Sequence, residues 1–209
     1  MNKRIEEVKM AQVQENVSVA KPVVGGAISV APIGTALPTD AITPLANTYK
    51  SLGYLSDDGI TVTNEMETEE IKAFGGDVVL KPQTKHTANF EYTMIEQNEQ
   101  AFKLYYGESN VEVTSGTGAI KIKLNSKLRP HEIIVIDLLL SDGRVRREVI
   151  PNGQVVETGE ISYKDDEAIG YKVKCEAYPY GSDGDKSYIY IDTPASNVQN
   201  AIKEAVKEK

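Results

Sequence analysis

The sequence has few of the residues on which catalytic and metal sites are usually built. It contains no tryptophan, one cysteine (Cys175) and two histidines (His86 and His131) in 209 residues. A single cysteine can form neither an intramolecular disulfide nor a cysteine-based metal cluster. Each histidine lies alone, one within a predicted strand and one at a strand start, where core or edge histidines are common. We therefore expect no catalytic residue, no metal site and no cofactor.

The sequence also lacks an excess of positive charge and any long hydrophobic run. Lysine and arginine number 23 against 31 aspartates and glutamates, so the net charge is −8. This balance argues against a sequence-reading DNA-binding protein, because the neutralisation of phosphates drives such binding. It leaves open a surface that DNA passes without binding. No apolar run approaches the roughly 20 residues of a membrane span, and residues 1–12 resemble no secretory signal. We expect a chain made and folded in a cytoplasm.

The pattern along the chain divides it into three parts. Residues 1–24 form an N-terminal arm, and Gly25-Gly26 opens a folded domain that extends to residue 192. This domain contains a long, proline-rich loop at residues 32–52. Residues 193–209 form a C-terminal helix or arm.

Strand signals dominate residues 25–192. Residues 85–94 alternate strictly between apolar and polar positions, which is typical of a half-buried strand. Residues 132–140 are apolar on both faces and predict a central strand. Turn signals at residues 56–59, and above all Pro151-Asn152-Gly153, predict hairpin turns. The regular spacing predicts a mainly β fold, a β-sandwich or barrel of about ten short strands.

Two helices are expected besides the strands. Residues 98–106 carry helix formers and precede Gly107, which predicts a short helix at about 97–106 that flanks the sheet. Thr193-Pro194 is a typical helix start, followed by an apolar stripe at helical spacing. This stripe predicts a C-terminal helix at about 195–207.

Two exposed segments are candidates for function. The loop at 32–52 is long for a compact domain, and loops of this length usually have a role of their own. The stretch 65–70 contains four glutamates. It is either a solvated strand end or loop, or a surface that must carry negative charge.

One ordered set of motifs is more specific than any of its members. The set is Gly26-Ala27-Ile28, then APIGTALPTDA at residues 31–41, LGYLSDDG at 52–59, IKAFGG at 71–76 and KLYYG at 103–107. In this order it resembles the N-terminal half of major tail tube proteins of long, non-contractile-tailed bacteriophages. The resemblance covers about residues 25–107. Phe74 stands where that family usually has tryptophan.

The resemblance implies a β-sandwich with a flanking helix and a structural function. Subunits would form hexameric rings that stack into a hollow tube, which conducts the genome and the tape-measure protein during ejection. The implied partners are further copies of the chain, the tape-measure protein, tail-completion or initiator proteins, and DNA in transient passage. The implied location is the virion tail, assembled in the host bacterial cytoplasm. No enzymatic activity and no cofactor are implied.

Within such a tube the two exposed segments receive expected roles. The long loop is a candidate for contact with the next ring through Pro32, Leu37, Pro38, Asp40, Pro44 and Tyr49. The acidic stretch is a candidate for part of the lumen lining through Glu65, Glu67, Glu69 and Glu70. Carboxylates in a lumen would repel phosphates and let DNA slide.

Two other functions are compatible with the strand pattern. A β-sandwich carbohydrate-binding or adhesin module would be a monomer with exposed aromatic side chains gathered in one groove. Tyr178, Tyr180, Tyr188 and Tyr190 are the candidates for that cluster, although cross-strand pairing explains them equally well. An enzyme would need a convergent polar pocket, for which the sequence gives no motif.

Overall fold

The computed structural model describes residues 17–23 and 25–192. Most of the expected N-terminal arm and the whole C-terminal helix expected at about 195–207 lie outside the described residues. Within the described part the protein is mainly β, as predicted, with thirteen strands and one α-helix, α1 (Glu99–Tyr106). The strands are β1 (Ala20–Pro22), β2 (Ile28–Pro32), β3 (Lys50–Ser51), β4 (Leu55–Thr68), β5 (Ile71–Lys72), β6 (Val78–Leu80), β7 (Gln83–Met94), β8 (Val111–Val113), β9 (Ile120–Ile122), β10 (His131–Leu140), β11 (Val145–Thr158), β12 (Tyr171–Ala177) and β13 (Tyr188–Asp192).

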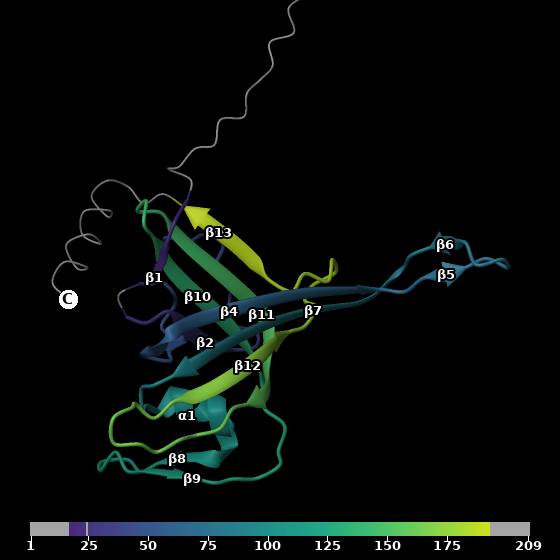
Figure 1. Ribbon diagram of the computed structural model, residues 1–209. Helices are drawn as coiled ribbons and strands as arrows, with labels where there is room; N and C mark the ends of the chain where they lie inside the picture. The colour runs from purple at the N-terminus through teal and green to yellow at the C-terminus, as the bar shows by residue number, and fades with distance from the viewer. Residues whose placement is uncertain (1–16, 24, 193–209) are drawn as a thin grey trace, which may run out of the picture.

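Nine strands form one antiparallel sheet. Its main order is β3-β2-β10-β11-β12-β7-β4, with β1 paired to the end of β10 and β13 to the start of β11. Figure 1 shows β4 and β7 passing across β10 and β11, so the sheet curls over on itself. Two small hairpins, β5–β6 and β8–β9, stand apart from it. Four strands have ten or more residues and are longer than the short strands predicted. The other nine have seven residues or fewer.

The core occupies both faces of β10, which confirms the prediction of a central strand. Ile134 and Ile136 point into the larger cluster, with Phe90 of β7 and Val173 of β12. On the opposite face Ile133 and Val135 join a smaller cluster with Ala31, Tyr49 and Val149. Successive side chains of a strand point to opposite faces, so a strand that is apolar throughout must be covered on both sides.

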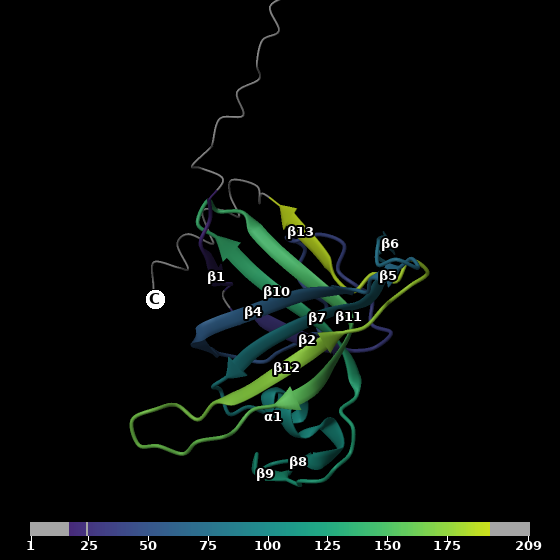
Figure 2. The same cartoon turned by 45° about the vertical axis from the view of Figure 1, so that its right-hand side comes forward.

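The short helix forms where it was predicted and is closed at both ends. The Asn98 side chain accepts a hydrogen bond from the Ala101 N–H at 2.9 Å, which caps the first turn. Gly107, at φ 95°, donates its N–H to the Lys103 carbonyl at 2.8 Å and ends the helix. Phe102 and Tyr105 each pack edge-on against Tyr171 at 5.4 Å. In Figure 2, α1 lies beneath the end of the sheet, beside β12.

Two predicted turns are wrong, because both sequences form bulges inside long strands. The pairing of β4 with β7 jumps from Leu55–Met94 to Ile60–Tyr92, so residues 56–59 loop outward while the strand continues. In β11 the pairing with β10 shifts around the buried Pro151. A bulge needs no ladder N–H at one position and therefore tolerates proline. Gly153 sits where an added Cβ would lie 2.7 Å from Ile134 Cδ1, so close packing rather than a turn explains this glycine.

Candidate assembly interface

The most prominent surface feature is a long extension of β4 and β7. Beyond the core the two strands continue as a pair, and β5 and β6 close the far end (Figure 1). Residues 64–81 are all exposed. We call residues 64–86 the projecting hairpin. From Glu65 to Phe74 an extended chain covers about 30 Å, at roughly 3.3 Å per residue.

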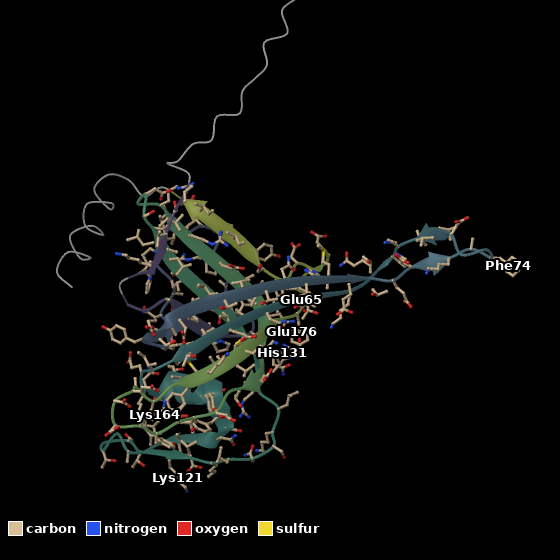
Figure 3. All side chains as sticks on the ribbon, viewed as in Figure 1. Glu65, Phe74, Lys121, His131, Lys164 and Glu176 are labelled. Carbon is tan, nitrogen blue, oxygen red and sulfur yellow. The ribbon has the colours of Figure 1, made fainter. Side chains whose placement is uncertain are left out.

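The tip of the projecting hairpin is apolar. Phe74 lies at its far end and is completely exposed, at 111% of its reference area (Figure 3). Residues 73–77 form the turn, in which Ala73 N–H donates to the Asp77 carbonyl at 2.8 Å. The neighbouring exposed apolar side chains are Ile71, Val78, Val79 and Leu80. Large apolar side chains that cluster on an exposed surface often mark an interaction site.

The four glutamates proposed for the lumen lie on the projecting hairpin and are exposed. Glu67 forms an ion pair with Lys85 at 3.0 Å, across the two strands. Glu70 pairs with Lys81 at 2.7 Å. Glu65 is the one nearest the sheet, where it pairs with Thr87. In the single subunit the stretch is therefore exposed to solvent at the end of β4 and just after it.

The loop at residues 33–49 folds back over its own sheet. Arg147, buried at 5% exposure, donates to the carbonyls of Asp40 and Thr43 at 3.1 and 2.8 Å. The same guanidinium binds both carboxylate oxygens of Asp137, at 2.6 and 3.0 Å. The hydroxyl of the buried Tyr49 donates to the Ala36 carbonyl at 2.8 Å. Arg147, which the sequence analysis did not single out, thus fastens the loop.

The six residues proposed for ring contacts are divided by this packing. Tyr49 is buried, while Leu37 is partly buried and packs against the smaller core cluster. The Thr43 hydroxyl and the N–H groups of residues 42 and 43 donate to the Asp40 carboxylate, which lowers the pKa of Asp40. Pro38 is half-buried, and Pro32 and Pro44 are exposed. A signal for this packing was present, since a tyrosine and two leucines in a loop are unusual unless they cover a core.

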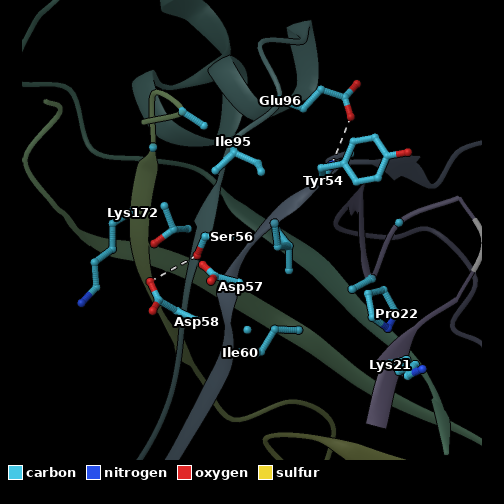
Figure 4. Close-up of a pocket in the computed structure, with 18 of the residues that line it drawn as sticks. Lys21, Pro22, Tyr54, Ser56, Asp57, Asp58, Ile60, Ile95, Glu96 and Lys172 are labelled. Atoms are coloured by element: carbon cyan, nitrogen blue, oxygen red, sulfur yellow. Dashed lines mark hydrogen bonds between the residues drawn. The ribbon is translucent and has the colours of Figure 1, made fainter. Parts of the chain in front are cut away.

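A groove lies at the start of β4. Its volume is about 1500 Å³ (Figure 4). It is lined by residues 20–23, 25–27 and 53–60, with Thr93, Ile95, Glu96, Leu138, Glu160, Ser162, Glu167, Ala168, Gly170 and Lys172. The Tyr54 N–H donates to the Glu96 carboxylate at 3.0 Å, and the Ser56 hydroxyl to Asp58 at 3.3 Å. We call it the β4 groove. It lies between β1 and the bulged start of β4, which both line it.

One face of the sheet is mostly polar. Opposite the larger core, the strands β4, β7 and β12 and the end of β11 present mainly polar side chains, because residues paired across strands share a face. The polar ones are Thr61, Thr63, Glu65, Thr87, Asn89, Glu91, Thr93, Glu157, Lys172, Lys174 and Glu176. The exposed Val156, in the bulge of β11, interrupts the polar residues of that strand. Glu91 pairs with Lys172 and Lys174 at 3.5 and 3.6 Å. This polar sheet face has four glutamates against two lysines, a net negative charge.

In the described part of the chain, the two histidines and the cysteine lie on three different strands. His86 contacts Asn64 on the projecting hairpin at 2.6 Å, and His131 contacts Asn152 at 2.7 Å. Cys175 is fully buried, and burial raises the pKa of its thiol to about 12. In residues 17–23 and 25–192, no three His, Cys, Asp or Glu side chains are placed to hold a metal ion. The helix in the same part of the chain is too short to cross a membrane.

Comparison with protein families gives one match, which covers most of the chain. A family model described as phage tail tube protein matches residues 10–201. No curated protein matches the chain.

Solved structures with some similarity come from tail-like particles. The cap that terminates the tube of the anti-feeding prophage shares 11% identity at a TM-score of 0.40, over 88% of this chain and all of that one. A chain of the sheath-tube complex of the extracellular contractile injection system PVC shares 11% at 0.39, over 82% and 93%. A chain from the tail of the empty GTA particle shares 8% at 0.38, over 81% and 95%.

Proposed function

Because this chain belongs to the phage tail tube protein family, we propose that it forms hexameric rings that stack into a hollow tube conducting the genome and the tape-measure protein. The family establishes the coarser part of this statement: the protein is a structural component of the phage tail and not an enzyme. The rings, their stacking and the passage of DNA are our proposal.

The observation that carries the proposal is the projecting hairpin. An isolated two-stranded hairpin is at best marginally stable in water, yet residues 64–81 are exposed along their whole length. The tip adds Phe74 and four further exposed apolar side chains. Such an element gains its stabilising contacts from another molecule, and contacts repeated from copy to copy build a filament.

Ring closure is supported by two unpaired strand edges. Among the described strands, β4 pairs with β7 alone, which leaves its outer edge of 14 residues without a partner. At the other side of the polar sheet face, pairing of β10 with β11 stops at His131–Gln154, so residues 155–158 have one free edge. Free edges are templates for pairing with another chain. Adjacent subunits would join these two edges and continue the sheet around the ring.

The polar sheet face is our candidate for the lumen. A continued sheet would present this face on one side of the ring all the way round. Its net negative charge suits a conduit, because phosphates are not held where they release no counterions. Glu65 belongs to this face, whereas Glu67, Glu69 and Glu70 lie farther along the projecting hairpin. They would extend the negative lining toward the next ring.

The loop at 33–49 remains a proposed surface for contact between rings. Arg147 fastens it to the sheet, so its contribution would come from exposed positions such as Ile42 and Pro44, beside Pro32 at the end of β2. Leu37, Pro38, Asp40 and Tyr49 would act indirectly, by shaping the loop. We further propose that tape-measure and tail-completion or initiator proteins are partners, and that assembly occurs in the host bacterial cytoplasm.

Electron microscopy of the purified chain at high concentration tests the proposal. We expect hollow tubes or six-membered rings in negative stain. A variant in which residues 69–81 are replaced by Asn-Gly should remain folded by circular dichroism and form no tubes. The double variant Leu124→Ala/Leu128→Ala alters side chains that are 84% and 83% exposed but lie outside the hairpin, and it should assemble normally. A wild-type chain that stays monomeric under all assembly conditions contradicts the proposal.

The alternative of a glycan-binding module gains little from the tyrosines. Tyr188 and Tyr190 pack against the smaller core cluster. Tyr178 contacts His131 with its ring tilted and the ring centroids 5.0 Å apart, and Tyr180 closes the turn to Asp185. None of the four lines the β4 groove. A strict monomer that binds glycans would nevertheless favour this alternative.

A further inference from the structure

The β4 groove and the projecting hairpin lie at opposite ends of one strand. Leu55, the first residue of β4, lines the groove, and Thr68, its last residue, lies in the projecting hairpin. Residues 56–59 bulge out of β4, so the distance is counted along its partner β7, where Leu55 pairs with Met94 and Thr68 with Gln83. At roughly 3.3 Å per residue it is about 36 Å. In Figure 1 the strand runs straight from the body of the molecule out to the hairpin. A hairpin from this distance does not fold back into its own groove.

The two features match in chemistry. Apolar side chains line part of the groove, among them Ile60 and Ile95 (Figure 4). Leu138 also lines it, and charged side chains such as Asp57 and Lys172 lie beside them. Ile60 and Leu138 are partly buried neighbours of the larger core cluster, so an occupant would extend the core. The tip of the hairpin offers Phe74 and a short run of aliphatic side chains, all exposed. Its turn is closed by the Ala73–Asp77 hydrogen bond, and the groove has a volume of about 1500 Å³.

We propose that the β4 groove receives the hairpin tip of a second copy of this chain, with Phe74 as the anchoring side chain. The inference rests on the proposed function and adds the acceptor site to it. A donor at one end of a subunit and an acceptor at the other make a heterologous contact that does not close, so copies add along one axis. The same contact would order the hairpin and fill the gap between β1 and β4.

The occupant is a second copy rather than the chain's own N-terminal residues. β1 itself forms one wall of the groove and is paired to β10 at Ala20–Leu140, so this part of the chain borders the groove and does not fill it. The hairpin tip, in contrast, presents five exposed apolar side chains for which the described fold offers no cover. A few aromatic side chains buried in pockets often supply most of the binding energy of a protein interface. Phe74 would have this role at the hairpin tip.

Cysteine cross-linking tests the assignment directly. The single native thiol, Cys175, is fully buried and does not compete for reagents. The double variant Phe74→Cys/Tyr54→Cys places one thiol at the tip and one at the groove. In assembled tubes a short bismaleimide should link neighbouring subunits into a ladder of dimers, trimers and larger species. The matched control Phe74→Cys/Leu124→Cys carries its second thiol at an equally accessible site outside the groove and should give no ladder.

The outcomes separate this inference from the proposed function. Tubes that form but give a ladder only with the Leu124 control, or with neither pair, overturn the groove assignment and leave the tube function standing. Absence of tubes from the wild-type chain overturns both. Deletion of residues 1–16 should leave the cross-linked ladder of the Phe74→Cys/Tyr54→Cys variant unchanged. If the thiol at position 54 reacts only after this deletion, the N-terminal segment occupies the groove and the inference is wrong.

A second measurement uses the strength of assembly. Phe74→Ala should raise the protein concentration needed for tube formation by about thirtyfold, the effect of losing one anchoring aromatic side chain. Phe74→Leu, which keeps an apolar anchor, should restore much of this loss. An unchanged threshold in Phe74→Ala contradicts the anchoring role.

Discussion

The two ends of the strand pair β4–β7 have the same backbone pairing and opposite surroundings. Over the sheet, Phe90, Tyr92 and Met94 of β7 are buried at 1%, 2% and 0% exposure. In the projecting hairpin the same ladder continues from Asn64–Ala88 to Glu67–Lys85, but residues 64–81 are exposed. Backbone pairing therefore does not distinguish the part that stabilises the fold from the part available to partners. Burial of side chains does, because the hydrophobic contribution scales with apolar area removed from water.

Two phenylalanines give the largest expected contrast. Phe90→Ala should lower the free energy of unfolding by about 3 to 5 kcal/mol, because it opens a cavity in the core. Phe74→Ala should leave the free energy of unfolding of the unassembled chain unchanged within about 0.5 kcal/mol while it weakens tube formation. Urea denaturation of both variants measures the difference. A large stability loss in Phe74→Ala would show that the hairpin tip packs on its own subunit.

Two ion pairs repeat the contrast with charged groups. Arg147→Ala should cost about 3 to 5 kcal/mol of stability, because it leaves the buried Asp137 carboxylate without its partner. It should also release the loop at 33–49, so limited proteolysis should cut there first. Lys81→Ala breaks an exposed pair with Glu70 on the hairpin and should cause no measurable change, since surface pairs contribute little. Equal effects of the two variants would remove the distinction between body and hairpin.

Two glutamates extend the comparison to pH. Glu132 is largely buried, its Oε2 atom has no hydrogen-bond partner, and burial together with the nearby Glu108 carboxylate raises its pKa to about 7. Between the ordinary glutamate value and pH 7 the folded chain binds more protons than the unfolded chain, so stability should fall as the pH rises through this window. Glu132→Gln should remove this decline and stabilise the protein at pH 8 by about 3 kcal/mol, with little effect at pH 4.

The matched control for pH is Glu67→Gln on the projecting hairpin. Glu67 is exposed and pairs with Lys85 at the surface, so the stability profile against pH should keep the wild-type shape. Thermal unfolding from pH 4 to pH 8 follows both variants. A profile of Glu132→Gln that still declines toward pH 8 would show that another group causes the effect.

The smallest effect is expected from the hairpin turn. Gly75 has a φ of +121°, a backbone conformation that residues other than glycine rarely adopt. Gly75→Ala should leave global stability unchanged while it speeds hydrogen exchange in residues 71–80 of the unassembled chain. Exchange at Tyr92, over the core, should stay as slow as in the wild type. Tube formation should slow hydrogen exchange in the hairpin. The hairpin would then be protected by contacts between subunits, as the core part of β7 is protected by contacts within one subunit.

Several local features were predictable because neighbouring residues determine them. Residues 85–94 alternate, and the strand β7 formed. Asn98 and Gly107 bracket the helix, and both act as caps. The apolar run at 132–140 became the central strand. In contrast, the turn signals at residues 56–59 and 151–153 gave wrong predictions, because each segment is a bulge that exists only through its pairing with a second strand.

The candidate interfaces were also predictable from the sequence only in part. The motifs that indicated a tail tube protein were present in the sequence and are confirmed by the family match. The acidic stretch and the proline-rich loop were recognisable, but not their surroundings. Arg147 lies 107 residues from Asp40, whose carbonyl it binds, and no local pattern connects them. The β4 groove is assembled from segments between Ala20 and Lys172.

The sequence by itself determined the mainly β character, the helix with its caps, the scarcity of catalytic groups and the family. These depend on periodicity, composition and short motifs, which act within a few residues. Only the tertiary structure decided that β4 and β7 leave the body as a projecting hairpin, that the long loop is fastened to its own sheet, and that a groove opens at the start of β4. The physical reason is that exposure is a property of what lies beside a residue in space. Phe74 and Phe90 are the same residue type in the sequence. The curled sheet buries Phe90, whereas Phe74 lies beyond the sheet and is exposed.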